Sequence, residues 1–360
     1  MGTKTITLII LGVLVLFSIV SLILVKVLYD AQFQRFDLPD ERLTTALRYS
    51  DYEEKYPREL VTFKSGSNTL QGYIYGKAND KGLVVIAHGL GGGADSYLGQ
   101  TTYFVDQGWC VFTYDATGSY RSEGKSTKGF PQSVLDLDAA LRYIETHPEL
   151  NNLPVFLFGH SWGGYAVCNV LHYDHQIAGV VSVAGVNSAM EIVIEQGRSL
   201  LGNFIYIQYP FLWLYQRLLF GNVLSFSAVD AINKSQTPVL IIHGTDDKEV
   251  AYDGSSIISK LDQITNPNVT AITLDEVGRN GHNNIFRSHQ ALHYVTSIQN
   301  ELNSLYEEYQ QDIPEKIKVE FFANIDRARA QELNSELMNQ INDFLDQCLE
   351  IESGRKINAN

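Results

Sequence analysis

The chain has 360 residues, of which 45% are hydrophobic, and this allows one α/β domain of about 250 residues together with additional segments. Its formal net charge is −14. Binding of nucleic acid needs clustered lysine and arginine, so this charge argues against a nucleic-acid partner. The three cysteines are odd in number and far apart, which favours free thiols in the core over a disulfide framework: Cys110, Cys168 and Cys348.

The first predicted element is a membrane-spanning helix. Residues 6–25 carry no charge, are mostly Ile, Leu, Val or Phe, and lie between Lys4 and Lys26. A stretch of this length can cross a bilayer core of about 30 Å. A cleavable secretory signal is the alternative, but its apolar core is normally shorter, and the residues after Lys26 form a poor cleavage site. We therefore expect residues 1–29 to be a single-pass anchor in the cell membrane, followed by a stalk at residues 30–58.

The orientation of this anchor is nearly balanced by charge. Lys4 and the amino terminus lie on one side of the apolar stretch, and Lys26 and Arg35 lie on the other. Because the stretch is so close to the amino terminus, we favour a signal-anchor arrangement with the domain that follows it outside the cytoplasm. Protease access to the domain in intact cells tests this expectation.

Two loops rich in glycine follow predicted strands. The apolar run Leu83–Ala87 leads into His88-Gly89, and Gly91-Gly92-Gly93 lets the chain pass close to a ligand. A second loop begins at Tyr114-Asp115 and continues through Gly118, Ser122 and Gly124.

The most informative motif is G-x-S-x-G at residues 159–163, with Ser161 at its centre. An apolar run, 155–158, leads into it and a helical pattern follows it. A strand, a sharp turn with serine at its tip, and a helix are the context that a nucleophile elbow needs. The flanking glycines avoid collisions with the neighbouring backbone. In isolation the motif also occurs by chance in glycine-rich loops, so its value depends on the rest of the chain.

Residues 186–236 separate the strand-like run 179–184 from the next one, and we expect them to form a small helical cap. The middle of this region is rich in aromatic residues, which predicts either an apolar cover over an acyl-binding pocket or a cap that simply buries its rings. We assign Phe211 and Trp213 to the pocket wall. The aromatic residues are Phe204, Tyr206, Tyr209, Phe211, Trp213, Tyr215 and Phe220.

A serine nucleophile needs a base, and the base needs an acid that orients it. The buried-type run 238–242 is followed by His243-Gly244-Thr245-Asp246-Asp247, which gives two candidate acids. The strand-like run 269–274 is followed by a Gly/Asn loop that contains His282. Taken alone, Asp247 is better explained as a turn residue and His282 as an exposed loop histidine. Their order along the chain is serine, acid, histidine. Proteins with a nucleophile elbow carry their three catalytic residues in this order.

The last part of the chain is predicted to be helical. Apolar residues recur at helical spacing from Leu333 to Leu349, so we expect a last helix that packs on the sheet, within a C-terminal extension at about 295–350. Two histidine pairs, His172/His175 and His289/His293, have spacings that suit one helix face. Neither pair has a third ligand in a recognisable motif, so we expect no metal site.

These motifs together resemble the α/β-hydrolase superfamily, in particular its serine-hydrolase branch of esterases, lipases and S33-type peptidases. The resemblance covers residues 59 to about 290. It rests on His88-Gly89, the elbow, the H-G-x-x-D-x-x-V stretch at 243–250 and Gly281-His282. The 115–124 loop is a looser match, with Thr117 where arginine is usual and Tyr120 where glycine is usual. The resemblance implies an α/β-hydrolase domain over 59–350, with a mostly parallel central sheet flanked by helices.

The resemblance also implies roles for particular residues. Ser161 would be the nucleophile, His282 the base and Asp247 the acid, with Asp246 as the second choice because the family spacing favours Asp247. The backbone N–H groups of Leu90 and Trp162 would form the oxyanion hole. No cofactor is implied.

The function predicted from these residues is hydrolysis of a carboxylic ester, including lipid or acylglycerol esters, as by a carboxylesterase or lipase at the membrane. A peptidase of the S33 or prolyl type is the alternative, and it would need an acidic group for the substrate amine, for which Glu191, Glu195 and Glu249 are candidates. A non-catalytic binding protein with a hydrolase fold is a further alternative. The sequence assigns neither the substrate nor the oligomeric state.

Overall fold

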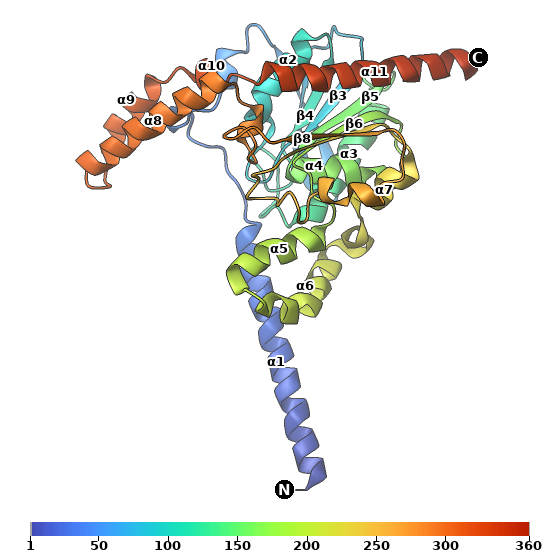
Figure 1. Cartoon of the computed structure of the whole chain (residues 1–360), viewed down its shortest axis with the longest axis vertical. Helices are drawn as coiled ribbons and strands as arrows, with labels where there is room; N and C mark the ends of the chain where they lie inside the picture. Colours follow the sequence, from blue (N-terminus) through green and yellow to red (C-terminus); the bar gives the residue numbers. More distant parts are fainter. Residues whose placement is uncertain (1, 360) are drawn as a thin grey trace.

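The computed structural model describes residues 2–359, and its centre is one eight-stranded sheet (Figure 1). The strand order is β1-β2-β4-β3-β5-β6-β7-β8. β1 and β2 pair antiparallel, β2 and β4 pair antiparallel, and all later pairs are parallel. The predicted, mostly parallel sheet is therefore confirmed. The strands are β1 (Arg58–Ser65), β2 (Asn68–Tyr75), β3 (Leu83–Ala87), β4 (Cys110–Tyr114), β5 (Val155–His160), β6 (Ile177–Val183), β7 (Val239–Gly244) and β8 (Val269–Leu274).

Helices cover both faces of this sheet, because successive side chains of a strand point to opposite faces. On β3, Val85 faces one hydrophobic cluster, with α3 and α4, while Val84 and Ile86 face the other, with α2 and α11. The helices of the domain are α2 (Leu98–Asp106), α3 (Phe130–Thr146), α4 (Trp162–Asn169), α7 (Ala228–Ser235), α8 (His289–Glu308), α9 (Glu315–Ala323), α10 (Arg327–Ala330) and α11 (Ser335–Ala359).

The last helix packs on the sheet, as its apolar spacing predicts. Leu337, Met338, Ile341 and Leu345 are buried in the second cluster, and Cys348 contacts the sheet beside Gly179. All three cysteines are buried and free, which confirms their predicted place in the core. Helices α8 and α9 project from the side of the domain (Figure 1).

The amino-terminal helix α1 (Thr3–Gln32) projects away from the domain, on the side opposite α11 (Figure 1). Two helices lie beside its last turns, α5 (Ala189–Leu201) and α6 (Phe204–Phe220), and both belong to the region predicted to be a cap. We call α5 and α6 the cap. After α1, the chain binds the domain directly, since Arg35 donates to the carbonyls of Tyr120, Ser122 and Gly124.

Candidate active site

Ser161 lies at the tip of a sharp turn between β5 and α4. Its backbone has φ +56° and ψ −114°, a conformation that costs free energy for a non-glycine residue and that occurs preferentially at functional sites. The glycines make this turn possible. A Cβ atom on Gly163 would lie 1.9 Å from the carbonyl oxygen of Ala87, so only glycine lets α4 begin this close to β3.

His282 and Asp247 are paired beside this turn. The Nδ1 atom of His282 lies 2.7 Å from the Oδ2 atom of Asp247, and both side chains are buried. Asp246, the second candidate acid, points elsewhere: its carboxylate is 60% exposed and forms an ion pair with Lys248. The structure therefore brings Asp247, and not Asp246, to the histidine.

Asp247 is held ionised by its surroundings. Burial alone would raise its pKa, but hydrogen bonds from His243 and His282 outweigh burial and keep the pKa of this carboxyl well below its usual range. Its Oδ1 atom also accepts from the backbone N–H groups of Glu249 and Val250. An ionised, immobilised carboxylate at Nδ1 is what fixes the tautomer of a catalytic histidine.

Ser161 and His282 line the same cavity, which has a volume of about 640 Å³. Within residues 2–359 the serine hydroxyl makes no hydrogen bond to His282, whose Nε2 atom lies 3.5 Å from the Oε2 atom of Glu249. Hydrogen bonds between a nucleophile and its base are often long before substrate binds and tighten with it. The arrangement is thus compatible with a serine that His282 activates when substrate binds.

The two residues predicted to supply the oxyanion donors are close to this serine, Leu90 in the lining of the same cavity and Trp162 as its neighbour in the chain. Leu90 lines the cavity next to Gly89, directly after β3. Trp162 is the first residue of α4, and the first N–H groups of a helix have no partner within the helix. The Trp162 side chain points into the core, where its Nε1–H donates to the Phe130 carbonyl 3.1 Å away. Trp162 could therefore donate to an oxyanion through its backbone N–H and not through its side chain.

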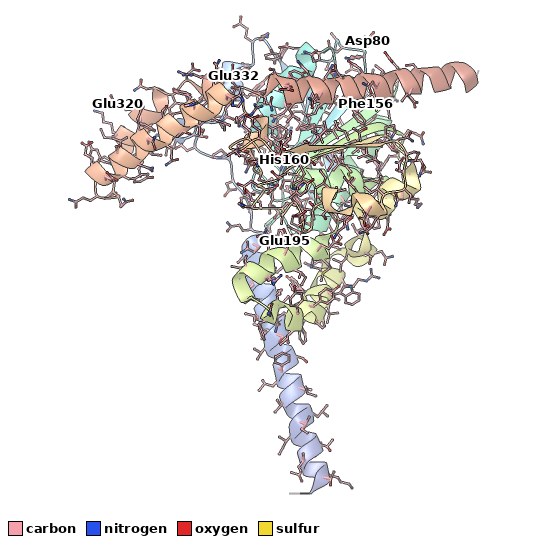
Figure 2. The ribbon with its side chains drawn as sticks, viewed as in Figure 1. Asp80, Phe156, His160, Glu195, Glu320 and Glu332 are labelled. Carbon is pink, nitrogen blue, oxygen red and sulfur yellow. The ribbon has the colours of Figure 1, made fainter. Side chains whose placement is uncertain are left out.

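A buried hydrogen-bonded chain joins three loops of the site, and sequence reasoning missed it. The Gly89 N–H donates to the Tyr97 hydroxyl at 3.0 Å, this hydroxyl lies 2.7 Å from His160 Nδ1, and His160 Nε2 lies 2.9 Å from the carbonyl of His282. Figure 2 shows His160 in the middle of the α/β domain. Tyr97 carries no motif that marks it, since its role depends on contacts between residues far apart in the sequence.

His160 should make the protein sensitive to acid. Burial lowers its pKa to about 3, whereas an unfolded histidine has a pKa of 6.5. Between these values the unfolded chain binds more protons, so the free energy of unfolding falls as the pH falls below 6.5. We therefore expect the free energy of unfolding of the native protein to fall, relative to that of His160→Gln, by about 1.4 kcal/mol for each pH unit of acidification. Between pH 6.5 and pH 4 the fall amounts to about 3 kcal/mol.

Urea unfolding of both proteins at several pH values measures this difference, because all other titrating groups are shared. If the free energy of unfolding changed with pH by the same amount in both proteins, His160 would not be the acid-sensitive group.

Asp115 belongs to the 115–124 loop, the looser of the sequence matches, and its carboxylate holds this loop against the glycine-rich loop after β3. Its carboxylate accepts from the backbone N–H of Ala94 at 2.8 Å, from the Tyr73 hydroxyl and from the N–H of Arg121. It therefore ties the 115–124 loop to the end of the glycine-rich loop that carries Leu90. Tyr120 occupies the usual glycine position with φ +41°.

The cap supplies one wall of the cavity, but not with the residues that we predicted. Phe211 and Trp213 do not line it; Ile205, Gln208 and Leu212 do. The reason is helical phase, since residues three, four and seven apart share one face of α6. Phe211 instead contacts Phe17 of α1, and Trp213 is 42% exposed. Both side-chain polar atoms of Gln208 are buried without a partner in the described residues, so this wall offers a polar group to a ligand.

No group of His, Cys, Asp or Glu that could hold a metal ion occurs within residues 2–359. The two histidine pairs have other contacts: His175 binds Asp138 and Glu145, and His289 lies 3.0 Å from Glu276.

Comparison with known proteins agrees with this architecture. A family model described as serine aminopeptidase, S33, matches residues 78–217, which include β3, the serine turn and the cap. A solved esterase of Pyrococcus furiosus, Pf2001, superimposes with a TM-score of 0.51 at 17% identity, over 78% of this chain and 100% of that one. This chain has the α/β-hydrolase fold.

Two curated proteins are similar to part of this chain. The uncharacterized peptidase YtmA of Bacillus subtilis (strain 168) is 27% identical over 178 residues, which are 47% of this chain and 64% of that protein. The lysophosphatidylserine lipase ABHD12 of Danio rerio is 24% identical over 173 residues, 47% of this chain and 44% of that protein. The match thus spans less than two thirds of each relative.

Proposed function

We propose that this α/β-hydrolase is a membrane-anchored serine hydrolase that cleaves carboxylic esters, with lipid esters as its substrate class. The observation that carries the proposal is the convergence of a serine in a strained turn, a His282–Asp247 pair and a large cavity at one place. The similarity to a solved esterase and to a lipase supports the same reaction class.

In the proposed reaction, Ser161 Oγ attacks the ester carbonyl while His282 Nε2 takes its proton. Asp247 holds the resulting imidazolium, and the N–H groups of Leu90 and Trp162 stabilise the negative charge on the carbonyl oxygen. His282 then gives the proton to the departing alkoxide, which leaves an acyl-serine. His282 next takes a proton from water, whose oxygen attacks the acyl carbon. The bond to Ser161 Oγ then breaks, His282 returns the proton to Oγ, and the carboxylic acid is released.

The anchor is supported by the surroundings of α1. Within this helix, 18 consecutive residues have a mean hydropathy of 3.2, and only 11% of them are buried. Signal sequences share this apolar composition. Its last turns, however, pack into the protein: Val25, Tyr29 and the following Phe33 are buried in the main hydrophobic cluster. Cleavage after residue 25 would remove part of this core, so we propose that the helix is retained as an anchor and that the domain lies outside the cytoplasm.

Leu212 should set the acyl length that the cavity accepts. Its side chain is 6% exposed and lines the cavity wall formed by α6. Leu212→Phe adds volume to this wall, so we expect kcat/KM for p-nitrophenyl esters of long acids to fall by about tenfold or more, while the acetate ester changes little. The measurement is an acyl-length series on the full chain in detergent.

The matched control is Leu214→Phe, which lies two residues away on the exposed face of α6 and should leave the length profile unchanged. An equal loss on short and long esters in Leu212→Phe would count against an acyl-binding cavity. Absence of turnover at every length, on esters and on peptide amides, would favour the non-catalytic alternative.

The peptidase alternative is supported by the similarity to the S33 aminopeptidase model and to the peptidase YtmA, and by one observation in the structure. Glu249 lines the cavity and lies beside His282, where a carboxylate could bind the amino terminus of a peptide. Among the described residues, the Glu249 carboxylate accepts a hydrogen bond only from Asn283, beside the cavity. Glu195 accepts from the backbone N–H groups of Ala251 and Ser255, and Glu191 accepts from Asn187, so these two carboxylates are held away from a substrate amine.

Glu249→Gln distinguishes the two functions. If the protein were an aminopeptidase, the variant should lose about tenfold or more of kcat/KM for amino-terminal amides, because a charge-assisted hydrogen bond is lost. For an esterase we expect ester turnover within about threefold of the native value. Parallel assays on a p-nitrophenyl ester and on an aminoacyl p-nitroanilide give the answer.

A further inference from the structure

The depth of the cap relative to the proposed membrane follows from α1. The uncharged stretch, residues 6–25, spans about 30 Å at 1.5 Å per residue, which is the thickness of a bilayer core. It ends at Lys26, which forms an exposed ion pair with Asp30. The bilayer surface on the side of the domain therefore lies near Lys26.

Helix α6 meets α1 below this surface. The ring of Phe211 packs edge-to-face on Phe17 with the ring centroids 5.9 Å apart. Phe17 precedes Lys26 by nine residues, or about 13 Å along the helix. Nearer the surface, the Tyr215 hydroxyl donates to Asp30 at 2.6 Å, and its ring packs on Tyr29. The segment of α6 before Tyr215 thus lies beside the membrane-spanning part of α1 (Figure 1).

The outer surface of the cap suits such a position. Large apolar side chains cover it, and the helix carries one charged residue, Arg217, in its last turn. An apolar patch of this extent on a soluble domain marks an interaction site, and Trp and Tyr are enriched where proteins meet the membrane interface. We call these residues the cap patch; they are Leu200, Phe204, Tyr206, Ile207, Tyr209, Trp213, Leu214, Leu218 and Leu219, each 39–76% exposed.

The cavity reaches the same depth. Its lining includes Leu24 and Val25 of the uncharged stretch, and Leu28 and Tyr29 just beyond it, as well as Ser161. The helix expected to serve as an anchor is consequently also a wall of the substrate cavity. Leu200 and Leu201, at the end of α5, line the cavity too, and Leu200 belongs to the cap patch as well.

We propose that the cap is embedded in one bilayer leaflet beside α1, with the lipid acyl chains covering the cap patch. A single-chain ester lipid then enters the cavity from that leaflet, between α1 and the cap, without its acyl chain crossing water. The inference rests on the proposed membrane anchoring. The occupant is lipid rather than a second copy of the chain because the patch is continuous with the apolar surface of α1.

Trp213 provides a direct test that needs no enzyme activity. It is the exposed one of three tryptophans, since Trp109 and Trp162 are fully buried in the domain. The full chain, inserted in phosphatidylcholine vesicles with brominated acyl chains, should lose a large part of its tryptophan fluorescence relative to vesicles of unbrominated lipid. In Trp213→Phe, this bromine-dependent loss should disappear.

Equal fluorescence in both kinds of vesicle, with insertion of α1 verified by flotation and alkaline extraction, would overturn the proposal. So would a dimer chemically crosslinked through the cap patch in the same vesicles. Because Ser161→Ala can be used in this experiment, its result is independent of whether the proposed hydrolysis occurs.

Ile207→Lys tests the route of entry. This residue is 55% exposed on the cap patch, and a lysine there opposes insertion. Turnover of a long-chain ester held in vesicles should fall by about tenfold or more, because charge is costly at this depth. Turnover of soluble p-nitrophenyl acetate should stay within twofold. Unchanged turnover of the vesicle-held ester would contradict entry through the embedded cap.

A different observation bears on the polar end of the substrate. Arg287 lines the cavity, and its guanidinium donates to the carbonyl and side chain of Gln331. Within residues 2–359 no carboxylate pairs with it, and burial lowers its pKa to about 10. The other charged residues of the lining are Lys248, which pairs with Asp246, and Glu249, which contacts His282 and Asn283. Arg287 is half-buried, and a partly buried charge without a counter-ion is costly and typical of a binding site.

We infer that Arg287 binds an anionic group, phosphate or carboxylate, on the polar end of the ester substrate. This refines the proposed ester hydrolysis to anionic amphiphiles. In Arg287→Gln, kcat/KM for a monoacyl glycerol phosphate should fall by about 10- to 100-fold, the worth of a charged hydrogen bond. Turnover of the uncharged monoacyl glycerol of the same chain should change by less than threefold.

Lys248→Gln is the matched control, because this lysine lines the cavity but is already paired. It should leave the preference for the anionic lipid intact. An equal loss on charged and uncharged lipids in Arg287→Gln would assign the residue a structural role and overturn the inference. A monoacyl ester with a succinyl head separates carboxylate from phosphate recognition.

Discussion

Ser161→Ala is expected to lower kcat for ester hydrolysis by about 10⁵- to 10⁶-fold, since removal of the nucleophile in serine hydrolases leaves only binding and oxyanion stabilisation. The alanine side chain offers no oxygen to the carbonyl, and Ser161 lies at the tip of the turn after β5, in the cavity. The measurement is steady-state hydrolysis of p-nitrophenyl butyrate by the full chain in detergent, with thermal unfolding recorded to confirm that the variant is folded.

Ser199→Ala is the control for this experiment. Ser199 also lines the cavity, but its hydroxyl donates to the Gln196 carbonyl within α5. We expect its activity to stay within about threefold of the native value, as for other substitutions remote from the chemistry. If Ser161→Ala kept more than a few per cent of native turnover, the serine would not be the nucleophile.

Asp247→Asn is expected to lower kcat by about 10⁴-fold, the effect seen when the acid of such a triad becomes an amide. The carboxylate accepts the Nδ1–H of His282, whereas an amide can present a donor at that place and favour the wrong tautomer. The base nitrogen would then carry a hydrogen and could not accept the proton of Ser161. The readout is kcat over a range of pH, at a temperature at which the variant remains folded.

Asp246→Asn is its natural control, because the two aspartates are adjacent and differ in environment. Asp246 is exposed and pairs with Lys248, so its substitution should change kcat by less than about threefold. A larger loss in Asp246→Asn than in Asp247→Asn would reverse the assignment of the acid.

The site could be predicted where its signal is local. The serine turn is encoded by neighbouring glycines and by the strand and helix that flank it, and His282 and Asp247 each follow a strand in the expected order. Parallel strands bring their carboxyl ends to one edge of the sheet, so residues after β5, β7 and β8 meet there. Local motifs and topology thus predicted that His282 meets an aspartate there, while the choice of Asp247 over Asp246 came from the resemblance to the hydrolase spacing.

Features that depend on distant packing could not be predicted. Phe211 and Trp213 are aromatic in a cap, but which face of α6 turns inward is decided by α1, a helix nearly two hundred residues earlier. The same holds for α1 itself. Its composition predicts a membrane span, yet the contribution of Leu24, Val25 and Leu28 to the cavity depends on where the cap lies.

Covalent labelling tests the central claim most directly. An alkyl fluorophosphonate carries a phosphorus centre that an activated serine attacks, with loss of fluoride, to give a stable adduct. Incubation of the full chain should give one adduct per chain, located by peptide mass spectrometry on Ser161, with ester hydrolysis lost in proportion. An unlabelled Ser161 in a protein that still hydrolyses esters, or full activity after complete labelling, would contradict the account.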